Sequence, residues 1–481
     1  MLEGVYQSKY WLSRLIIQRG IGLMYVIAFV VAINQFRPLL GENGLLPVPS
    51  FIERISFKRS PSIFHWHYSD TFFAIIAWIG LGLSLLAVTG ISDSSPIWLS
   101  VSVWLLLWGL YLSIVNVGQL FYGFGWESLL LEASFYAIFL GPLHYQTPFL
   151  MILMIRWLLL RVEFGAGLIK MRGDKCWRKL TCLNYHHETQ PMPNPLSRFF
   201  HLLPESYHKI ETLFNHIVQL GAVWLLFLPQ PFASIGAGMI ILSQGYLILS
   251  GNYAWLNWMT LILAFSGISD SYLQYLFPLQ IPQSIVTPTY FQLIIIGLAI
   301  IVAYMSIAPI KNMISPHQRM NASFNPLHLV NTYGAFGTVT KARYEIIIEG
   351  TTETNITHDT EWKEYKFKGK PGAPRKMPSQ FAPYHLRLDW QIWFAAMSSL
   401  KSNPWLIRLI IKLLQNDQLT TKLLAHNPFD KRPPTYIRAR LFKYEFTNHE
   451  EFKNDHRWWK REFERTYMPP RSLNQLQVFK L

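Results

Sequence analysis

Long apolar stretches, separated by short polar connections, dominate the first 310 residues of the chain. A helix that crosses a bilayer needs about 20 predominantly apolar residues. The fourth and the eighth of nine such stretches are short enough for half-spans or interfacial helices. The pattern predicts a mainly α-helical domain that crosses a membrane about nine times. The stretches lie at residues 15–35, 71–90, 97–117, 127–141, 148–169, 213–229, 232–250, 253–268 and 290–310.

The pattern changes after residue 320, where polar residues become frequent and the apolar runs shorten. Residues 338–349 are rich in β-branched side chains and residues 361–368 alternate between polar and apolar, so we expect the two segments to pair as a hairpin. Residues 386–400 and 404–415 have the spacing of amphipathic helices. Residues 436–446 alternate again and are typical of a strand. This part of the chain is therefore expected to fold as an α+β domain.

Charge divides the chain at the same place. Only 15% of all residues are charged, whereas about a quarter is usual in soluble proteins. Residues 311–481 contain 27 Lys and Arg and 15 Asp and Glu, a net charge of +12, against +3 for residues 1–310. We predict a membrane domain at 1–310, which includes a polar loop at 169–212, and an α+β domain at 311–481.

The basic residues do not indicate a nucleic-acid partner. They are scattered among acids and aromatics, without a Lys/Arg-rich run and without zinc-finger or helix-turn-helix spacing. Anionic lipid headgroups are the expected partner of this charge. With nine spans, the loop at 169–212 and the C-terminal domain lie on one face of the membrane. The loop's seven Lys and Arg favour the cytoplasm, but this rule is weak for long segments, so charge leaves the side open.

The polar loop also contains both cysteines of the chain, Cys176 and Cys182. Two cysteines are too few for a disulfide framework, and their spacing fits two free thiols as well as one local disulfide. Histidines are frequent here too, but their spacing matches no usual zinc pattern. We therefore expect hydrogen-bonding or interfacial histidines, with no metal and no cofactor. The four histidines are His186, His187, His201 and His208.

Ionisable residues interrupt the fifth apolar stretch. Arg156, Glu163 and Lys170 are seven residues apart, which places them on one stripe of a helix. A lone charge at mid-bilayer costs about 2.5–3.5 kcal/mol, so the stripe must face protein or a wet cavity. Two interpretations remain open, a buried polar site between the fourth and fifth spans or an ion-pair network that only fixes helix packing. The full set is Glu127, Glu132, Arg156, Arg161, Glu163 and Lys170.

In the C-terminal domain, residues 383–396 form the densest segment of aromatic and charged side chains. The segment has two interpretations. It forms an aromatic core helix with a surface ion pair, or it forms a partner-binding surface. The second is considered because Trp, Tyr and Arg dominate binding hot spots. We see no hydrolase elbow, P-loop or GxGxxG motif that would indicate a common catalytic class. The candidate binding residues are Arg387, Asp389, Trp390 and Trp393, with Arg343 and Glu345 on a nearby strand.

Several long segments carry a resemblance to a known family. From about residue 14 to about residue 467, the chain resembles the lipase maturation factor family. The segments are FGWESLLLEASF (124–135), RWLLLRVEFGAGLIKMRGDKCWRKLTCLNYHHETQPMPNPLS (156–197), NTYGAFGTVTKARYEIIIEGT (331–351), PYHLRLDWQIWFAA (383–396), NPF (427–429), YIRARLFKYEF (436–446) and RWWKR (457–461).

The resemblance implies a multi-pass membrane protein of the endoplasmic reticulum whose C-terminal domain faces the lumen. In a bacterium, the corresponding place is the inner membrane. Animal members of the family help dimeric secreted lipases reach an active, secretable form, and no catalytic residues are settled for them. On this basis we expect folding secreted proteins as clients. A lumenal loop would also favour a disulfide between Cys176 and Cys182.

A more distant similarity connects the apolar spans with the membrane domain of vitamin K-dependent gamma-carboxylase. The run AGLIK (166–170) is similar to the place where that enzyme keeps a catalytically important lysine, and Lys170 corresponds to it. The leading hypothesis is therefore a maturation factor whose C-terminal domain and 169–212 loop bind a client. The alternative is a membrane enzyme with a polar site around Lys170, in which a lysine beside Arg156 and Arg161 would act as a base.

Overall fold

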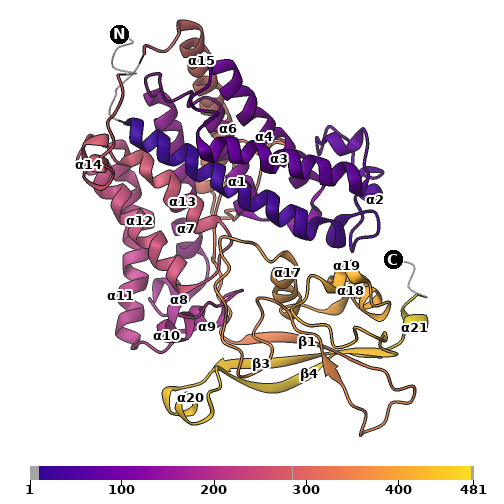
Figure 1. The fold of residues 1–481 in the computed structure, drawn as a ribbon. Coiled ribbons are helices and arrows are strands. Elements are labelled where there is room, and N and C mark those ends of the chain that lie inside the picture. Colours follow the sequence, from indigo (N-terminus) through magenta and orange to yellow (C-terminus); the bar gives the residue numbers. More distant parts are fainter. Residues whose placement is uncertain (1–9, 284, 478–481) are drawn as a thin grey trace.

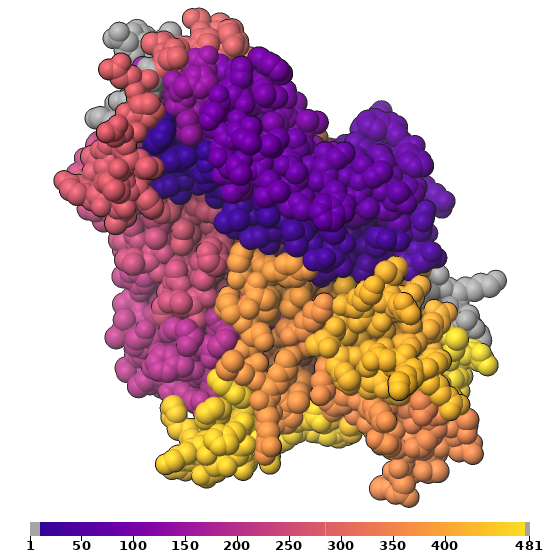
Figure 2. Space-filling view, viewed as in Figure 1, coloured from indigo at the N-terminus to yellow at the C-terminus, as the bar shows by residue number. Residues whose placement is uncertain are grey.

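The computed structural model describes residues 10–283 and 285–477. Helices formed by the first 314 residues pack together as one half of the molecule, and a four-stranded sheet with its own helices packs beneath them (Figure 1). Figure 2 shows the two halves in contact along a broad seam. A single cluster of buried apolar side chains extends through both halves. The two predicted domains therefore share a continuous core.

Six helical segments of the described chain are long and apolar enough to cross a membrane. Two of them are composite: α11 continues through a π turn and a 3-10 turn to Phe227, and α15 continues into α16. They coincide with six of the nine predicted apolar stretches. Their bounds are α1 Trp11–Leu40, α3 Asp70–Thr89, α4 Ile97–Val117, α11 Glu205–His216, α12 Phe232–Ser250, α15 Thr289–Met305 and α16 Ile307–Ile314.

The other three predicted stretches form helices at the centre of this half. They are α6 Gly125–Ile138, α7 Phe149–Arg172 and α13 Leu256–Ala264. The helices α6 and α13 are short, as their apolar stretches were, and α7 carries the ionisable stripe. Eleven of the fourteen residues of α6 are buried, and α13 packs against α1, α6, α7 and α12. Because these helices are surrounded by protein, their polar side chains avoid lipid.

Short helices fill the connections. The loop after α7 folds into three of them, which pack near α11 and α12 (Figure 1). Their bounds are α8 Lys175–Arg178, α9 Leu183–Thr189 and α10 Ser197–His201, and the others in this half are α2 Val48–Ile52, α5 Gln119–Tyr122 and α14 Asp270–Leu276.

The C-terminal sheet has the strand order β2-β1-β3-β4, and every neighbouring pair is antiparallel. The expected hairpin forms, with Glu349 opposite Glu364. The strand expected at residues 436–446 has those bounds as β3. The edge strand β4 was not predicted. The strands are β1 Arg343–Thr351, β2 Lys363–Glu364, β3 Tyr436–Phe446 and β4 Trp459–Arg471.

Helices of the C-terminal half connect its sheet to the membrane half. The helix α17 packs against β1 on one side and α5 on the other, and it lies between the sheet and the upper helices in Figure 1. The helix α18 begins at Pro404, which suits a first helical position because the proline lacks an N–H. The bounds are α17 Arg387–Ala396, α18 Pro404–Leu414, α19 Gln418–Thr421, α20 His449–Asp455 and α21 Leu473–Gln477.

Candidate functional site: a cavity between the two halves

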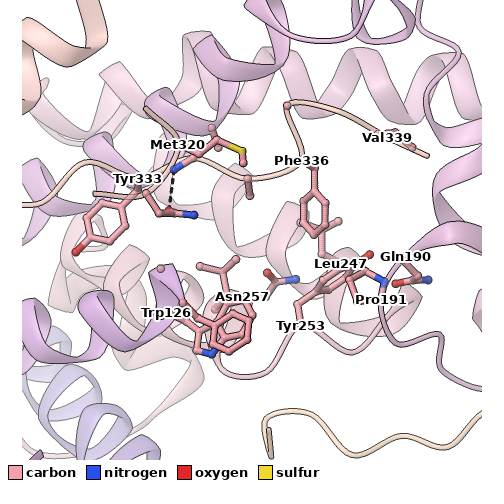
Figure 3. Close-up of a pocket in the computed structure, with 18 of the residues that line it drawn as sticks. Trp126, Gln190, Pro191, Leu247, Tyr253, Asn257, Met320, Tyr333, Phe336 and Val339 are labelled. Atoms are coloured by element: carbon pink, nitrogen blue, oxygen red, sulfur yellow. Dashed lines mark hydrogen bonds between the residues drawn. The ribbon is translucent and has the colours of Figure 1, made fainter. Parts of the chain in front are cut away.

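A cavity of about 340 Å³ lies where the two halves meet. Residues of α6, α7, α12 and α13 form its membrane-half wall, and α17 with the extended segment 333–340 forms the opposite wall. Large side chains from both walls, such as Trp126, Tyr253 and Phe336, surround the space (Figure 3). A mainly apolar pocket with a few polar groups is the usual form of a ligand or partner site.

The extended segment reaches this position because α7 has a glycine where the two touch. A Cβ added to Gly165 would overlap the carbonyl oxygen of Tyr333. The absence of a side chain therefore lets the segment run directly against α7. From there the segment continues past the cavity into β1.

Several polar atoms in the cavity walls have no hydrogen-bond partner among residues 10–283 and 285–477. Glu163 Oε1 accepts a hydrogen bond from Gln244 Nε2 at 2.6 Å, but Glu163 Oε2 has no partner. The same holds for Asn257 Nδ2, Gln190 Oε1 and Trp126 Nε1, three residues labelled in Figure 3. A buried polar group without a partner costs about 1–3 kcal/mol. These atoms are buried within the walls, so residues with unmet hydrogen-bonding capacity border the cavity.

Exposed apolar side chains mark the place where the cavity opens. Met320, Phe394 and Met397 all line it, yet their exposed fractions are 44%, 41% and 43%. Trp393 also lines it and is half-buried, whereas Trp390 is buried. Methionine adapts its shape to different partners. The opening is therefore an apolar, adaptable surface that leads into a polar-lined interior.

The charged residues predicted to bind a client do not lie on the surface. Arg387 is completely buried and forms an ion pair of 2.7 Å with Glu127 of α6. It also donates to the carbonyl oxygen of Phe121, and its guanidinium lies 3.4 Å from the centre of the Tyr122 ring. Asp389 is buried as well and accepts a hydrogen bond from the Gly369 N–H. Burial raises the pKa of Asp389 to about 6.

Arg343 and Glu345 are buried too. Glu345 pairs with Arg343 at 2.6 Å and with Lys370 at 2.8 Å. Arg343 also donates to the carbonyl oxygens of Glu188 and Gln190, which fastens β1 to the loop that follows α7. Burial lowers the pKa of Lys370 to about 8.

Client contact by Arg387, Asp389, Arg343 and Glu345 stays a prediction, and the structure places all four side chains in the interior. At 0–2% exposure, nearly all of the surface of each side chain already contacts other residues of the same chain. Arg387 joins the two halves through Glu127, and Arg343 joins β1 to the loop that follows α7. The two tryptophans of the same prediction, Trp390 and Trp393, do line the cavity.

The six ionisable residues of the membrane half do not converge on one site. Arg161 pairs with Glu132, which also accepts hydrogen bonds from Tyr333 Oη and the Asn331 N–H at 2.8 and 2.9 Å. This buried network joins α6 and α7 to the extended segment. Glu127, five residues earlier on α6, binds Arg387 instead.

The predicted stripe of α7 faces the α11–α13 region. Arg156 donates to the carbonyl oxygens of Ser266 and Leu226, at the irregular ends of two helices where carbonyls lack helical partners. Glu163 bonds Gln244 of α12. Lys170 Nζ donates to the side-chain oxygens of Asn215 and Gln219, at 2.8 and 2.9 Å, and lies over the Trp177 ring. Only Glu163 of the six residues lines the cavity.

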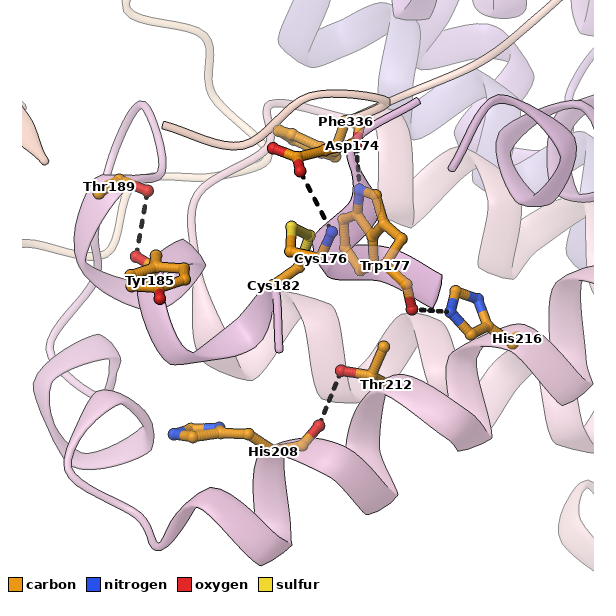
Figure 4. Close-up of a disulfide and its surroundings, with 10 residues drawn as sticks. All are labelled: Asp174, Cys176, Trp177, Cys182, Tyr185, Thr189, His208, Thr212, His216 and Phe336. Carbon is orange, nitrogen blue, oxygen red and sulfur yellow. Dashed lines mark hydrogen bonds between the residues drawn. A yellow bond between two sulfur atoms is a disulfide. The ribbon is translucent and has the colours of Figure 1, made fainter. Parts of the chain in front are cut away.

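Cys176 and Cys182 form a disulfide that closes the start of the polar loop (Figure 4). Within this closed turn, Trp177 Nε1 donates to the carbonyl oxygen of Phe336 at 2.7 Å. The ring of His216 on α11 contacts the Trp177 carbonyl at 3.1 Å. The disulfide thus supports a turn that holds a cavity residue, Phe336, and α11 together.

Sequence reasoning did not place His186, Tyr253 and Asn257 in one site, because they come from separate segments of the chain. His186 contacts Tyr253 Oη at 2.9 Å, and both line the cavity. Burial lowers the pKa of His186 to about 3, so its imidazole is neutral at pH 7. Asn257 lies within an apolar stretch, where a lone polar side chain was the available signal.

Comparison with known proteins covers nearly the whole chain. Residues 12–275 match the family described as the lipase maturation factor transmembrane domain, and residues 329–469 match the lipase maturation factor C-terminal domain. No solved structure matches the chain.

Full-length relatives agree with these family matches. Lipase maturation factor 1 of Mus musculus is 39% identical and that of Homo sapiens 38% identical, each over 99% of this chain and 90% of the relative. Lipase maturation factor 2 of Homo sapiens is 26% identical over 96% of this chain and 83% of its own length.

Proposed function

The chain belongs to the lipase maturation factor family, and from this premise we propose that it is a membrane-bound maturation factor for secreted lipases. We further propose that the cavity between its two halves binds an incompletely folded client. The relatives named above, which match almost end to end, carry lipase maturation in their names.

The cavity is the observation that carries the binding proposal. An incompletely folded chain exposes apolar side chains together with backbone N–H and C=O groups that lack partners. The opening at Met320, Phe394 and Met397 offers apolar, adaptable surface to such side chains. Polar residues also line the interior, among them Asn257, Thr260 and Gln244, and we propose that they hydrogen-bond to these backbone groups. We therefore propose that one site provides both apolar contacts and hydrogen bonds to an unfolded segment.

The proposed location is the membrane of the endoplasmic reticulum, with the cavity opening and the C-terminal domain in the lumen. For a bacterial source, the inner membrane takes its place. The disulfide between Cys176 and Cys182 supports a non-cytoplasmic loop, because disulfides persist in oxidising compartments. Membrane lipids surround the six long apolar segments.

A rescue assay tests the proposal. The chain is expressed in cells that lack their own lipase maturation factor, and secreted lipase activity is measured per amount of chain. The double substitution Trp393→Ala and Phe394→Ala removes aromatic surface at the opening without touching the buried ion pairs. We expect wild type to rescue secretion and the double variant to lose most of the rescue at equal protein level.

Phe463→Ala provides the matched control. Phe463 is an aromatic side chain of β4 that is 55% exposed and does not line the cavity, so rescue should be unchanged. A photo-crosslinking amino acid at position 394 should capture the nascent lipase, and one at position 463 should not. Full rescue by the double variant would contradict the cavity as the client site, and no rescue by wild type would contradict lipases as clients.

The enzyme alternative around Lys170 is not supported by the comparisons, which match maturation factors. Lys170 is held by Asn215 and Gln219 and lies outside the cavity lining. The two arginines expected beside it, Arg156 and Arg161, bind other partners. The residues of a shared polar site are therefore dispersed, and the client-binding function fits the geometry better.

A further inference from the structure

Two histidines and a glutamate lie close together where α9 meets α11. His187 comes from α9, and His208 and Glu211 come from the first turns of α11. Their ligand atoms all lie within 4.8 Å of one another. The His187 and His208 side chains are 2% and 3% exposed, and that of Glu211 is 10% exposed. Figure 4 shows the His208 ring pointing away from α11.

The separations within this cluster are long for hydrogen bonds. His187 Nε2 lies 3.2 Å from Glu211 Oε1, and His208 Nδ1 lies 3.4 Å from Glu211 Oε2. An N–H···O bond most often measures about 2.9–3.0 Å. With metal–ligand bonds of about 2.0–2.1 Å, two ligands of a tetrahedral zinc ion are separated by about 3.4 Å. The two His–Glu separations therefore match those expected between ligands of one ion.

The surroundings can orient the His208 ring for this role. If His208 binds through Nδ1, its Nε2–H is free to donate to the His201 carbonyl oxygen, which lies 3.4 Å away. A second partner of this kind fixes the ring of a metal-binding histidine. His187 approaches Glu211 through Nε2, and its buried Nδ1 has no partner within the described chain. Each ring thus directs one nitrogen toward the carboxylate.

We propose that His187, His208 and Glu211 bind a zinc ion, with a fourth position left for an exchangeable ligand such as water. Two imidazoles with one carboxylate suit zinc, whereas Mg²⁺ and Ca²⁺ prefer oxygen ligands. Three protein ligands and one open position are typical of zinc sites that are not purely structural. This assignment goes beyond the proposed maturation function and does not depend on it.

The ion would stabilise the part of the cavity wall that contains His186 and Gln190. His187 lies between His186 and Gln190, two residues of the same short segment that line the cavity. A zinc bridge from His187 to α11 fixes this segment relative to the membrane half. Linear spacing did not reveal the set because His187 and the His208–Glu211 pair belong to different helices, 21 residues apart.

Metal content tests the assignment directly. The full chain is purified in detergent with an affinity tag that contains no histidine, and its metals are measured by mass spectrometry. We expect about one zinc per chain in the wild type and loss of most of it in His208→Ala and Glu211→Ala. His216→Ala is the matched control, because His216 is a buried histidine of the same helix that contacts Trp177 instead. It should keep its zinc.

A second measurement covers variants that fail to fold. The wild-type chain is stripped with a chelator and titrated with Co²⁺, whose visible spectrum reports tetrahedral nitrogen and oxygen ligands. Zinc should displace the cobalt and raise the thermal midpoint, since a ligand that binds only the folded state stabilises it. A wild-type chain without zinc and without a cobalt spectrum would overturn the proposal and leave a hydrogen-bonded His–Glu cluster. Stoichiometric iron would overturn the choice of zinc.

Discussion

Two buried glutamates on neighbouring helices, Glu127 of α6 and Glu163 of α7, have opposite surroundings. Glu127 accepts a hydrogen bond from Tyr111 and pairs with Arg387 of the C-terminal half. Glu163, which lines the cavity, receives one hydrogen bond, from Gln244, and its other oxygen has no partner in the described structure. Both side chains are at most 1% exposed, so burial alone does not distinguish them.

The difference is that Glu127 has a compensating charge, whereas Glu163 has none at hydrogen-bond distance among the residues that the structure describes. At Glu127 an opposite charge compensates the loss of water, and the pair joins two segments that are 260 residues apart. At Glu163 the compensation is incomplete, because only one of its two oxygens has a hydrogen-bond partner in the described structure. Buried polar groups of folded proteins normally have such partners, so the unpaired oxygen sets Glu163 apart from Glu127.

The largest effect is expected from Glu127→Gln. This substitution leaves the Arg387 guanidinium buried without its counter-charge, which costs about 3–5 kcal/mol. Thermal unfolding in detergent, together with the cellular level of the chain, measures the loss. Adding Arg387→Met should recover part of it, because it removes the buried charge that has lost its partner. A stable single variant would show that the junction does not depend on this pair.

A smaller effect is expected from Lys170→Ala. The substitution leaves the side-chain oxygens of Asn215 and Gln219 without their donor, at a cost of about 1–3 kcal/mol. We expect lipase rescue per amount of chain to persist, because Lys170 lies outside the cavity lining. Complete loss of rescue at an unchanged protein level would instead favour the enzyme alternative.

Glu163→Gln should have the smallest effect on stability. Glutamine keeps an oxygen that can accept the hydrogen bond from Gln244, and it removes a charge that has no opposite partner at hydrogen-bond distance. We expect a change within about 0.5–1 kcal/mol of wild type but reduced lipase rescue, since Glu163 lines the proposed client cavity. A large stability loss would place Glu163 in the same class as Glu127 and remove the contrast.

Local pattern predicted much of the fold. The apolar stretches became helices because length and hydrophobicity decide whether a segment suits a membrane interior. The stripe of Arg156, Glu163 and Lys170 does face one side of α7, since helical periodicity fixes the direction of side chains. The hairpin and β3 followed from alternation.

The strand β4 was missed for a physical reason. Its sequence, WKREFERTYMPPR, contains many charges and two prolines, which argue against an ordinary strand. An edge strand tolerates both, because one side of it needs no ladder partner and one face meets solvent. Phe463, 55% exposed, shows how open this strand is. Its position at the edge of the sheet could be known only from the pairing with β3.

The sequence by itself determined the membrane class, the helices and the direction in which their ionisable residues point. Tertiary structure decided which partner each ionisable residue meets. Glu132 binds Arg161 of α7, between the two helices expected to interact. Glu127 instead binds Arg387, and Asn331 adds a hydrogen bond to Glu132, both from segments far along the chain. A period of 3.6 residues sets the face of a side chain, but the group opposite that face depends on long-range packing, which no local pattern encodes.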